Sequence, residues 1–418
     1  MNSETTTRLS VPMHGTDSRI RWLVLTVAWA ALVLSTVCRL AWGTLAIPLG
    51  QSLSLPLAAL GMFVTAFYVG YVLSNFVCGF ATDRVGGRVA LSASLVSLAV
   101  ATYAFSYTPS LTVGLVLQAL MGLTAGADYA AGVKLVTTWF EKRERGRAVG
   151  LLMSASSVAV IATNAILPTL VEAYGWRLSY RLLGVLAVFL AVVCATVLRD
   201  RAQAADVSRP GERSLHRARP HGEILADIRA LMTRNFVLLA LAGCGAFWGT
   251  LGFTAWAIPL MVKAHHVAPV QAGYVLAVAG IAGLFAKPAI GWLSDSVGAR
   301  RKLLAILSLI FFCAALLAFG RLDDLAAFRL AAPFIGVGAF VYSPLLVTMV
   351  AEQAGLSKAG SAAGVANAVW QLGSALSPAL VGLVFQAQHS FPLAFAVLAA
   401  GPLVGAICLA FIKEGQRQ

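Results

Sequence analysis

The sequence contains one short pattern twice, as GFATDRVGGR at residues 79–88 and as GWLSDSVGARR at residues 291–301. Both copies read Gly-x-x-x-Asp-x-x-Gly-x-Arg, and both lie between apolar stretches of about twenty residues. A pattern that recurs at a matching place in two parts of a chain indicates an internal repeat. The chain is therefore predicted to consist of two related halves.

The composition predicts a surface that faces lipid. Of 418 residues, 59% are hydrophobic and 11% are charged, and the mean hydropathy is +0.83. A water-soluble chain of this length needs a far larger polar surface. The charges gather in short islands between the apolar stretches, which is typical of helices that cross a bilayer.

The apolar stretches predict twelve transmembrane helices in an all-α fold. They lie near residues 22–47, 57–80, 89–107, 112–139, 148–170, 178–198, 235–262, 270–293, 302–320, 326–350, 361–386 and 391–412. Residues 199–234 contain eight arginines and two prolines, so this segment is expected to stay outside the membrane. The predicted domains are a six-helix bundle at 1–198, a cytoplasmic linker at 199–234 and a second six-helix bundle at 235–418.

The lysines and arginines predict the orientation, because cytoplasmic loops collect positive charge. One side of the predicted membrane has 23 of them and the other has five. Both termini are therefore expected in the cytoplasm of a multi-pass protein of the cell membrane, here a bacterial inner membrane. The net charge of +14 follows from this asymmetry and implies no nucleic-acid partner.

The reactive residue types indicate no enzyme. The six cysteines fall in apolar segments without metal-binding spacing, and the six histidines fall in predicted loops or tails. No nucleophile constellation or phosphate-binding loop is found. We therefore expect no catalytic residue, no metal and no cofactor.

The repeated loop is suited to gating at the cytoplasmic helix ends. Its first glycine is expected to let two helices approach closely, its second permits a tight turn, and its aspartate can bind a helix end or an arginine. The predicted gating residues are Gly79, Asp83, Arg84, Gly86, Arg88, Gly291, Asp295, Gly298 and Arg300. Ser296 stands where the first copy has Arg84, which predicts a weaker second contact. The alternative is that these are only turn residues beside cytoplasmic arginines.

With this repeat and the arrangement of two six-helix halves around a linker, the whole chain resembles the major facilitator superfamily of secondary transporters. The segments that look like its anion:cation symporter branch are Arg39 ahead of Ala46-Ile-Pro48, Tyr68-Val-Gly70-Tyr71, Thr138-Trp139-Phe140 followed by Arg145-Gly146-Arg147-Ala-Val-Gly150, and Tyr174-Gly175-Trp176-Arg177. The resemblance implies alternating access, a monomer, and import of small organic anions with protons or sodium.

Arg39 is the predicted anchor for the anion. It lies roughly 14 Å from the outer end of the first span near Pro48, and an ionisable group at such depth costs roughly 2.5–3.5 kcal/mol. A guanidinium group stays protonated and binds a carboxylate, sulfonate or phosphate through two parallel hydrogen bonds. The alternative is an arginine satisfied by helix carbonyls or by a structural acid.

Asp128 is the predicted proton site, because it is the acid that falls inside a predicted span, roughly 16 Å from Trp139 at the span end. Burial favours a protonated carboxyl group and a nearby arginine favours an ionised one. Proton binding is therefore expected to depend on whether an anion occupies Arg39. The alternative is a permanent Arg39–Asp128 pair that only fixes helix packing.

The role of Asp128 does not come from the resemblance. In the symporter branch span four has an arginine, then a glycine four residues later and often an acid three after that, where this chain has Gln118, Gly122 and Ala125. Asp128 lies one turn beyond, on roughly the same face. Its role is inferred from position and chemistry.

Other polar and aromatic residues are predicted to line a central cavity. The predicted substrate-binding residues are Arg39, Tyr68, Tyr71, Tyr129, Trp248, Lys287, Tyr342, Asn367, Trp370 and Gln371, with Trp256 as a further candidate. Asn367 and Gln371 share one helix face. For Lys287, as for Lys134, the alternative is a side chain that extends to the membrane surface.

The sequence therefore predicts a proton-coupled symporter that imports a small carboxylate or sulfonate. The first alternative is proton-driven efflux of drugs or metabolites, although the stretch from Gly150 to Pro168 lacks the G-P-x-x-G-G run of many antiporters. The second alternative is a transporter-like membrane sensor. The absence of a sizeable soluble output domain weighs against that alternative.

Overall fold

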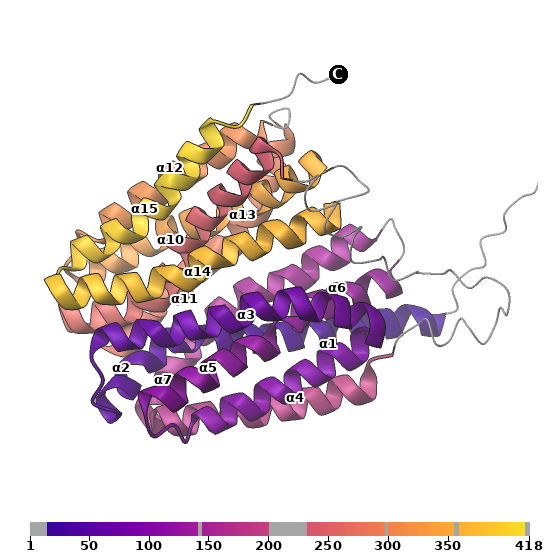
Figure 1. The fold of residues 1–418 in the computed structure, drawn as a ribbon, viewed down its shortest axis with the longest axis horizontal. Helices are drawn as coiled ribbons and strands as arrows, with labels where there is room; N and C mark the ends of the chain where they lie inside the picture. The colour runs from indigo at the N-terminus through magenta and orange to yellow at the C-terminus, as the bar shows by residue number, and fades with distance from the viewer. Residues whose placement is uncertain (1–14, 141–143, 200–231, 297–299, 355–358, 414–418) are drawn as a thin grey trace, which may run out of the picture.

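A computed structural model describes residues 15–140, 144–199, 232–296, 300–354 and 359–413 (Figure 1). Every regular element within these residues is an α-helix. The helices are α1 (Gly15–Leu40), α2 (Trp42–Ser52), α3 (Leu57–Val85), α4 (Gly87–Phe105), α5 (Leu111–Ala125), α6 (Ala127–Trp139), α7 (Arg145–Val197), α10 (Arg234–His265), α11 (Pro269–Ser296), α12 (Arg301–Phe319), α13 (Leu325–Ala354), α14 (Ala359–Gln388) and α15 (Phe391–Ala410).

Eleven segments of the described chain are long and apolar enough to cross a membrane. The longest helix, α7, has 53 residues and therefore rises about 80 Å, whereas a bilayer core is about 30 Å thick. Its backbone leaves the helical region at Gly175, with φ 76° and ψ 165°. The parts before and after Gly175 match the predicted spans near 148–170 and 178–198, while the total of twelve stays a prediction.

The outer surface is apolar. Phe285 is 71% exposed, and Trp292 and Leu330 are each 75% exposed. Keeping such a side chain out of water is worth about 1.5–3 kcal/mol, so a surface of this kind is unfavourable in water. Lipid tails contact these side chains without that cost, and the chain is accordingly a multi-pass membrane protein.

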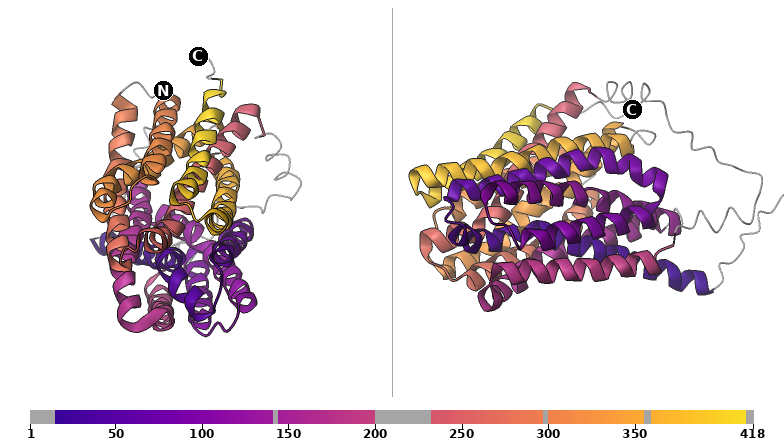
Figure 2. Two further views of the ribbon diagram at one scale, coloured as in Figure 1. Left: turned by 90° about the vertical axis from the view of Figure 1, so that its left-hand side faces the viewer. Right: turned by 60° about the horizontal axis from the view of Figure 1, so that its bottom comes forward.

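The helices run up and down between two opposite ends of the molecule (Figures 1 and 2). We call the end where α1 begins and α15 finishes the terminal end. The opposite end, with the α2–α3, α10–α11 and α14–α15 connections, is the distal end. Helices α1 to α7 are called the first half and α10 to α15 the second half.

Among the described helices, the main contacts between the two halves are α3 against α14, α7 against α11 and α2 against α10. Within the first half, α1 and α4 pack on α7, and α3 packs on α5. Within the second half, α10 packs on α14 and α15, and α11 packs on α13. Large buried side chains from both halves, such as Trp42 and Trp256, belong to one continuous core.

The two halves are in close contact near the distal end. The backbone N–H of Ala58, at the start of α3, donates to Gln386 Oε1 at 2.7 Å, and Thr65 Oγ1 donates to the Ala375 carbonyl at 2.5 Å. Gly43 of α2 lies so near the Thr254 carbonyl of α10 that a Cβ would come within 2.7 Å of it. The distal end is therefore closed between these helices.

Two glycines allow α3 and α5 to cross closely. A Cβ on Gly70 would overlap the Ala119 carbonyl, and a Cβ on Gly122 would overlap the Phe67 carbonyl. Backbones that approach this closely in a membrane need residues without side chains. The crossing fixes α5, and with it the start of α6, against α3.

The first copy of the repeated loop forms the predicted tight turn between α3 and α4. Gly86 has φ 89° and ψ 158°, a conformation that favours glycine. Arg88 Nε donates to the Ala195 carbonyl at 3.0 Å, which connects the start of α4 to the end of α7. Arg300 is exposed and directly precedes α12.

The other predicted gating residues are described only in part or not at all. Gly298 and the side-chain environments of Gly79, Asp83, Arg84 and Asp295 lie outside the description. The close helix approach expected at Gly291 is not seen among the described residues, because a Cβ there would meet no described neighbouring atom within 4 Å. The exposed Trp292 beside it indicates that this part of α11 faces outward.

Candidate functional site

Arg39 lies where the first membrane segment changes from α1 to α2. It is in the last turn of α1, where the partial negative charge of a helix end favours a cation. Its Nε atom is buried and has no hydrogen-bond partner among the described residues. One donor of the guanidinium group is therefore free.

Aromatic rings of α3 contact this guanidinium group. Arg39 Cζ lies 5.5 Å from the ring centroid of Tyr71, within the range of a cation–π interaction. Tyr71 stacks on Phe67 at 6.1 Å and meets Tyr68 edge-on at 6.2 Å. The structure thus brings three predicted residues, Arg39, Tyr68 and Tyr71, into one cluster.

Asp128 is buried in the first turn of α6, where the helix N-terminus favours a negative charge. Ser35 of α1 donates a hydrogen bond to its Oδ2 atom, and Ser94 of α4 donates one to its Oδ1 atom. Hydrogen bonds to a charged acceptor contribute about 1.5–3 kcal/mol each. Side chains from three helices therefore meet at this carboxylate.

Ser94 has a second acceptor within reach, because its Oγ lies 2.5 Å from the Thr124 carbonyl oxygen. A serine hydroxyl has one proton to donate and can also accept. It can donate to Asp128 when the carboxylate is ionised. When Asp128 is protonated, Asp128 can donate to Ser94 while Ser94 donates to Thr124, so both states of the carboxyl group are satisfied.

Arg39 and Asp128 are neighbours without forming an ion pair. Ser35, which bonds Asp128, is one helix turn before Arg39 on the same face of α1, about 6 Å along the axis. The ion pairs within the described residues are Arg21–Glu144 and Arg301–Glu352. The direct Arg39–Asp128 pair considered from the sequence is therefore not formed in this structure.

Lys287 lies in the contact between the two halves. Its Nζ donates to Ser157 Oγ of α7 at 3.0 Å and lies 5.1 Å from the ring centroid of Phe340. The side chain therefore does not extend to the membrane surface here. Lys134, in contrast, donates to the Thr82 carbonyl at 2.7 Å near the terminal end.

The second half contributes another aromatic cluster. The ring centroid of Phe247 lies 6.4 Å from that of Tyr342 and 5.6 Å from that of Trp370. The Tyr342 hydroxyl shares a 2.8 Å hydrogen bond with Thr250. The indole Nε1 of Trp370 is buried without a hydrogen-bond partner in the described structure, and it packs directly against Gly243 of α10, where a Cβ would overlap it.

The polar pair on α14 is placed as expected for neighbours on one helix face. Gln371 is buried and its Oε1 accepts a hydrogen bond from Ser374 at 3.0 Å. Asn367, one turn earlier, is half-buried. Both are on the helix that contains Trp370.

Of the three other predicted residues, Tyr129 lies near Tyr71, with which it interacts electrostatically, and the two tryptophans bond elsewhere. Trp248 donates its indole N–H to the Val397 carbonyl at 2.9 Å, and Trp256 donates to the Pro378 carbonyl at 2.8 Å. Both indoles therefore use their polar atom in helix packing. Tyr129 is 50% exposed.

Sequence reasoning missed the serines of the site. Ser35, Ser94 and Ser157 each bond an ionisable side chain on another helix. The spacing of Ser35 and Arg39 is a signal that was available, since it places both on one helix face. For metals, the part of the chain that the structure describes contains no group of three or more His, Cys, Asp or Glu side chains suited to an ion.

A bundle of apolar helices in two contacting halves, with buried charges between the helices, is typical of a membrane transport protein. The sequence model of the Major Facilitator Superfamily matches residues 27–378, and the chain belongs to this family.

Individual relatives span nearly the whole chain. The membrane sensor protein UhpC of Salmonella typhimurium is 27% identical over 95% of this chain and 93% of its own. A putative tartrate transporter of Agrobacterium vitis is 24% identical over 84% of this chain and 83% of its own. A bacterial homolog of the human lysosomal transporter Spinster, solved in an inward-facing and unoccupied conformation, has the same fold, with a TM-score of 0.74, 15% identity and coverage of 94% and 96%.

Proposed function

We propose that the chain is a proton-coupled symporter that imports a small organic anion by alternating access. Arg39 binds the anion and Asp128 binds the proton. The observation that supports this most is the separation of the two charges: Arg39 keeps a free donor, and Asp128 has its own hydroxyl donors. An anion can therefore bind Arg39 without displacing Asp128.

Substrate and proton influence each other through charge. An anion on Arg39 neutralises a positive charge about one helix turn from Asp128 and thereby favours protonation. Departure of the anion restores the positive charge and favours release of the proton. The Ser94 hydroxyl supports both states, because it can turn between Asp128 and Thr124.

The substrate class in this proposal is a small carboxylate or sulfonate. The planar guanidinium group matches the two oxygens of such a group. Buried Tyr68 and Tyr71 add hydroxyl groups and ring surface for the rest of the molecule, and Trp370 adds ring surface. A relative named as a putative tartrate transporter makes tartrate a suitable first substrate to test.

The proposal includes an arrangement in the membrane. The bundles at 1–198 and 235–418, joined by the linker at 199–234, move relative to one another in a single monomeric chain. The terminal end, with both chain termini, faces the cytoplasm. Closure at the distal end by Ala58 and Gln386 then corresponds to a state shut toward the outside.

Uptake into proteoliposomes tests the proposal. The purified chain is supplied with labelled tartrate, succinate, a small sulfonate or a cationic drug, with and without an inward proton or sodium gradient. Accumulation of an anion that depends on the proton gradient supports the proposal. Accumulation that depends on the sodium gradient would make sodium the coupling ion in place of the proton. Drug movement in exchange for protons would support efflux instead.

A membrane sensor is the second candidate, because a relative named as the membrane sensor protein UhpC matches 95% of this chain. The discriminating result is binding without transport. If the purified chain binds an anion through Arg39 but moves none under any gradient, while cells still respond to that anion, the sensor function is favoured.

A further inference from the structure

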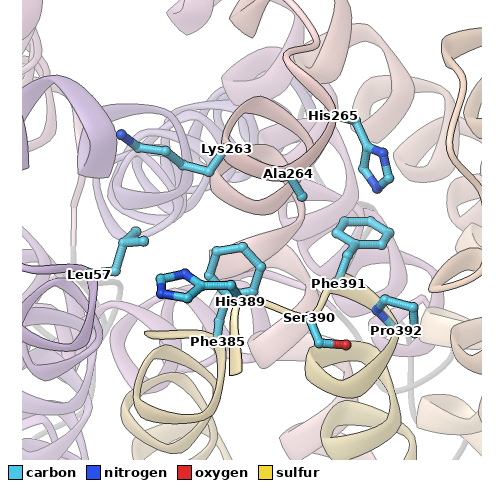
Figure 3. Close-up of a pocket in the computed structure, with 9 residues that line it drawn as sticks. All are labelled: Leu57, Lys263, Ala264, His265, Phe385, His389, Ser390, Phe391 and Pro392. Atoms are coloured by element: carbon cyan, nitrogen blue, oxygen red, sulfur yellow. The ribbon is translucent and has the colours of Figure 1, made fainter. Parts of the chain in front are cut away.

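The distal end contains a cavity of about 610 Å³ whose charged lining is basic (Figure 3). Lys263, His265 and His389 line it together with the apolar side chains of Leu57, Phe385 and Phe391, and no carboxylate is among the lining residues. The cavity is separate from Arg39 and Asp128. Its volume falls within the range of about 300–1,000 Å³ that is usual for small-molecule sites.

The basic groups come from two places in the fold. Lys263 and His265 lie in the last turn of α10, and His389 lies in the α14–α15 connection. In Figure 3, Lys263 and His389 lie on the side of Leu57, while His265 lies on the other side with its ring 4.4 Å from that of Phe391. The groups therefore flank a common space from two sides.

Two observations describe how these side chains are placed. His389 directly follows the last residue of α14 and has φ 48°, a left-handed conformation common at helix C-termini, which turns the chain into the α14–α15 connection beside the cavity. His265 Nε2 is buried and has no hydrogen-bond partner among the described residues. Asp323 interacts electrostatically with His265, so Lys263 and His389 are the groups best placed to meet an added negative charge.

We infer that this cavity is a second anion-binding site, for a small organic carboxylate at the distal entrance. Lys263 binds the carboxylate, the His389 imidazole donates a hydrogen bond to it, and Leu57, Phe385 and Phe391 contact its carbon skeleton. Leu57 belongs to the first half, and Lys263, Phe385, His389 and Phe391 belong to the second. A bound anion therefore contacts both halves and stabilises the closed distal end.

The test uses the full chain with ¹⁵N-labelled histidine in phosphatidylcholine nanodiscs, with tartrate as the probe and chloride at matched ionic strength as the reference. His389→Asn, which keeps a residue type that tolerates φ > 0, assigns the His389 imidazole signal. Tartrate is expected to shift that signal with saturation. Lys263→Met is expected to raise the half-saturating concentration about tenfold or more, whereas Lys413→Met, which removes a charge at the terminal end, is expected to leave it unchanged.

The result is independent of transport, because the same titration is repeated in Arg39→Lys. An unchanged titration there supports a second site even if no substrate is ever transported. Absence of a saturable shift, or a titration unaffected by Lys263→Met, overturns the inference. The titration is also repeated in nanodiscs that contain phosphatidylglycerol. A His389 signal that is already fully shifted there before tartrate is added also overturns the inference, because the site then holds a lipid headgroup.

Discussion

At the scale of single residues, the arrangement around Asp128 keeps the proposed proton site apart from the proposed anion site at Arg39. A direct ion pair would engage both groups with each other. The two serine donors of Asp128 hydrogen-bond the ionised form, so that Arg39 acts on it through charge alone, without a direct contact. Arg39 in turn is held by the end of α1 and the Tyr71 ring, neither of which neutralises its charge. Each group can therefore exchange its own ligand.

Arg39→Lys keeps the positive charge but loses the planar pair of donors. We expect tartrate binding to weaken by about tenfold or more, because lysine cannot make two parallel hydrogen bonds to one carboxylate. Arg321→Lys is the matched control, since Arg321 donates to the Leu317 carbonyl at the distal surface. Equal binding by both variants, measured with labelled tartrate, would contradict the role of Arg39.

Asp128→Asn removes the proton site and keeps the size of the side chain. We expect exchange of labelled for unlabelled substrate to continue, because it needs no net proton movement, and gradient-driven accumulation to stop. Glu172→Gln, at an exposed position of α7, is the control and should accumulate normally. Full accumulation by Asp128→Asn would remove this residue from the mechanism.

Ser94→Ala removes the hydroxyl that serves both states of Asp128. A hydrogen bond to a charged group contributes about 1.5–3 kcal/mol, so we expect proton-driven uptake to slow roughly tenfold or more. Ser92→Ala on the same helix is the control, because the Ser92 hydroxyl has no described hydrogen-bond partner. Initial uptake rates of the two variants decide the point, and similar rates would argue against Ser94.

At the scale of helices, glycines determine where elements can touch. Gly70 and Gly122 bring α3 and α5 into backbone contact, and this crossing supports both the Tyr68–Tyr71 cluster and the start of α6. Gly86 and Gly175, in contrast, are needed for their positive φ angles. One pair of glycines therefore allows close helix packing, and the other pair allows the chain to turn.

Gly122→Ala should destabilise this crossing. Its Cβ would meet the Phe67 carbonyl, and overpacking of this kind costs typically about 1–3 kcal/mol. Gly150→Ala in α7 is the control, because a Cβ there meets nothing within 4 Å and alanine favours a helix. Melting temperatures in detergent should fall for the first variant only, and a similar fall for both would contradict the argument.

The sequence predicted the all-helical fold and the turn at Gly86, because hydropathy and repeated glycines depend on local pattern alone. It also indicated Arg39 and Asp128, since a charge in an apolar span stands out. It could not predict that Ser35 and Ser94 bond Asp128, because serine is common in such helices and this meeting depends on how α1, α4 and α6 pack. Trp248 and Trp256 show the same limit: their indole partners, Val397 and Pro378, are backbone carbonyls on other helices.

At the scale of the whole molecule, the described contacts between the halves run from the distal end to Lys287 and Ser157. Ala58–Gln386 and Thr65–Ala375 close the distal side, and Lys287–Ser157 joins α11 to α7. Alternating access requires the distal contacts to separate when the other face closes. The protein in this structure therefore represents one of at least two states of the proposed cycle.

Cross-linking the distal contact should stop this cycle. We expect Ala58→Cys with Gln386→Cys, joined by a short bifunctional thiol reagent, to lose uptake and to recover it when a cleavable linker is reduced. Asn235→Cys with Lys413→Cys is the control, because this contact at 2.9 Å lies within the second half. Continued uptake by the cross-linked distal pair would show that these helix ends need not separate.

The chemistry of the distal contacts also sets how the closed state responds to salt. The contacts described there are neutral hydrogen bonds at Ala58 and Thr65 and backbone packing at Gly43. Dissolved ions screen charges over about 8 Å at physiological ionic strength, which affects neutral groups little. We expect the stability of the closed distal end to be the same at low and at high ionic strength, whereas the attraction of an anion to Lys263 weakens as the ionic strength rises.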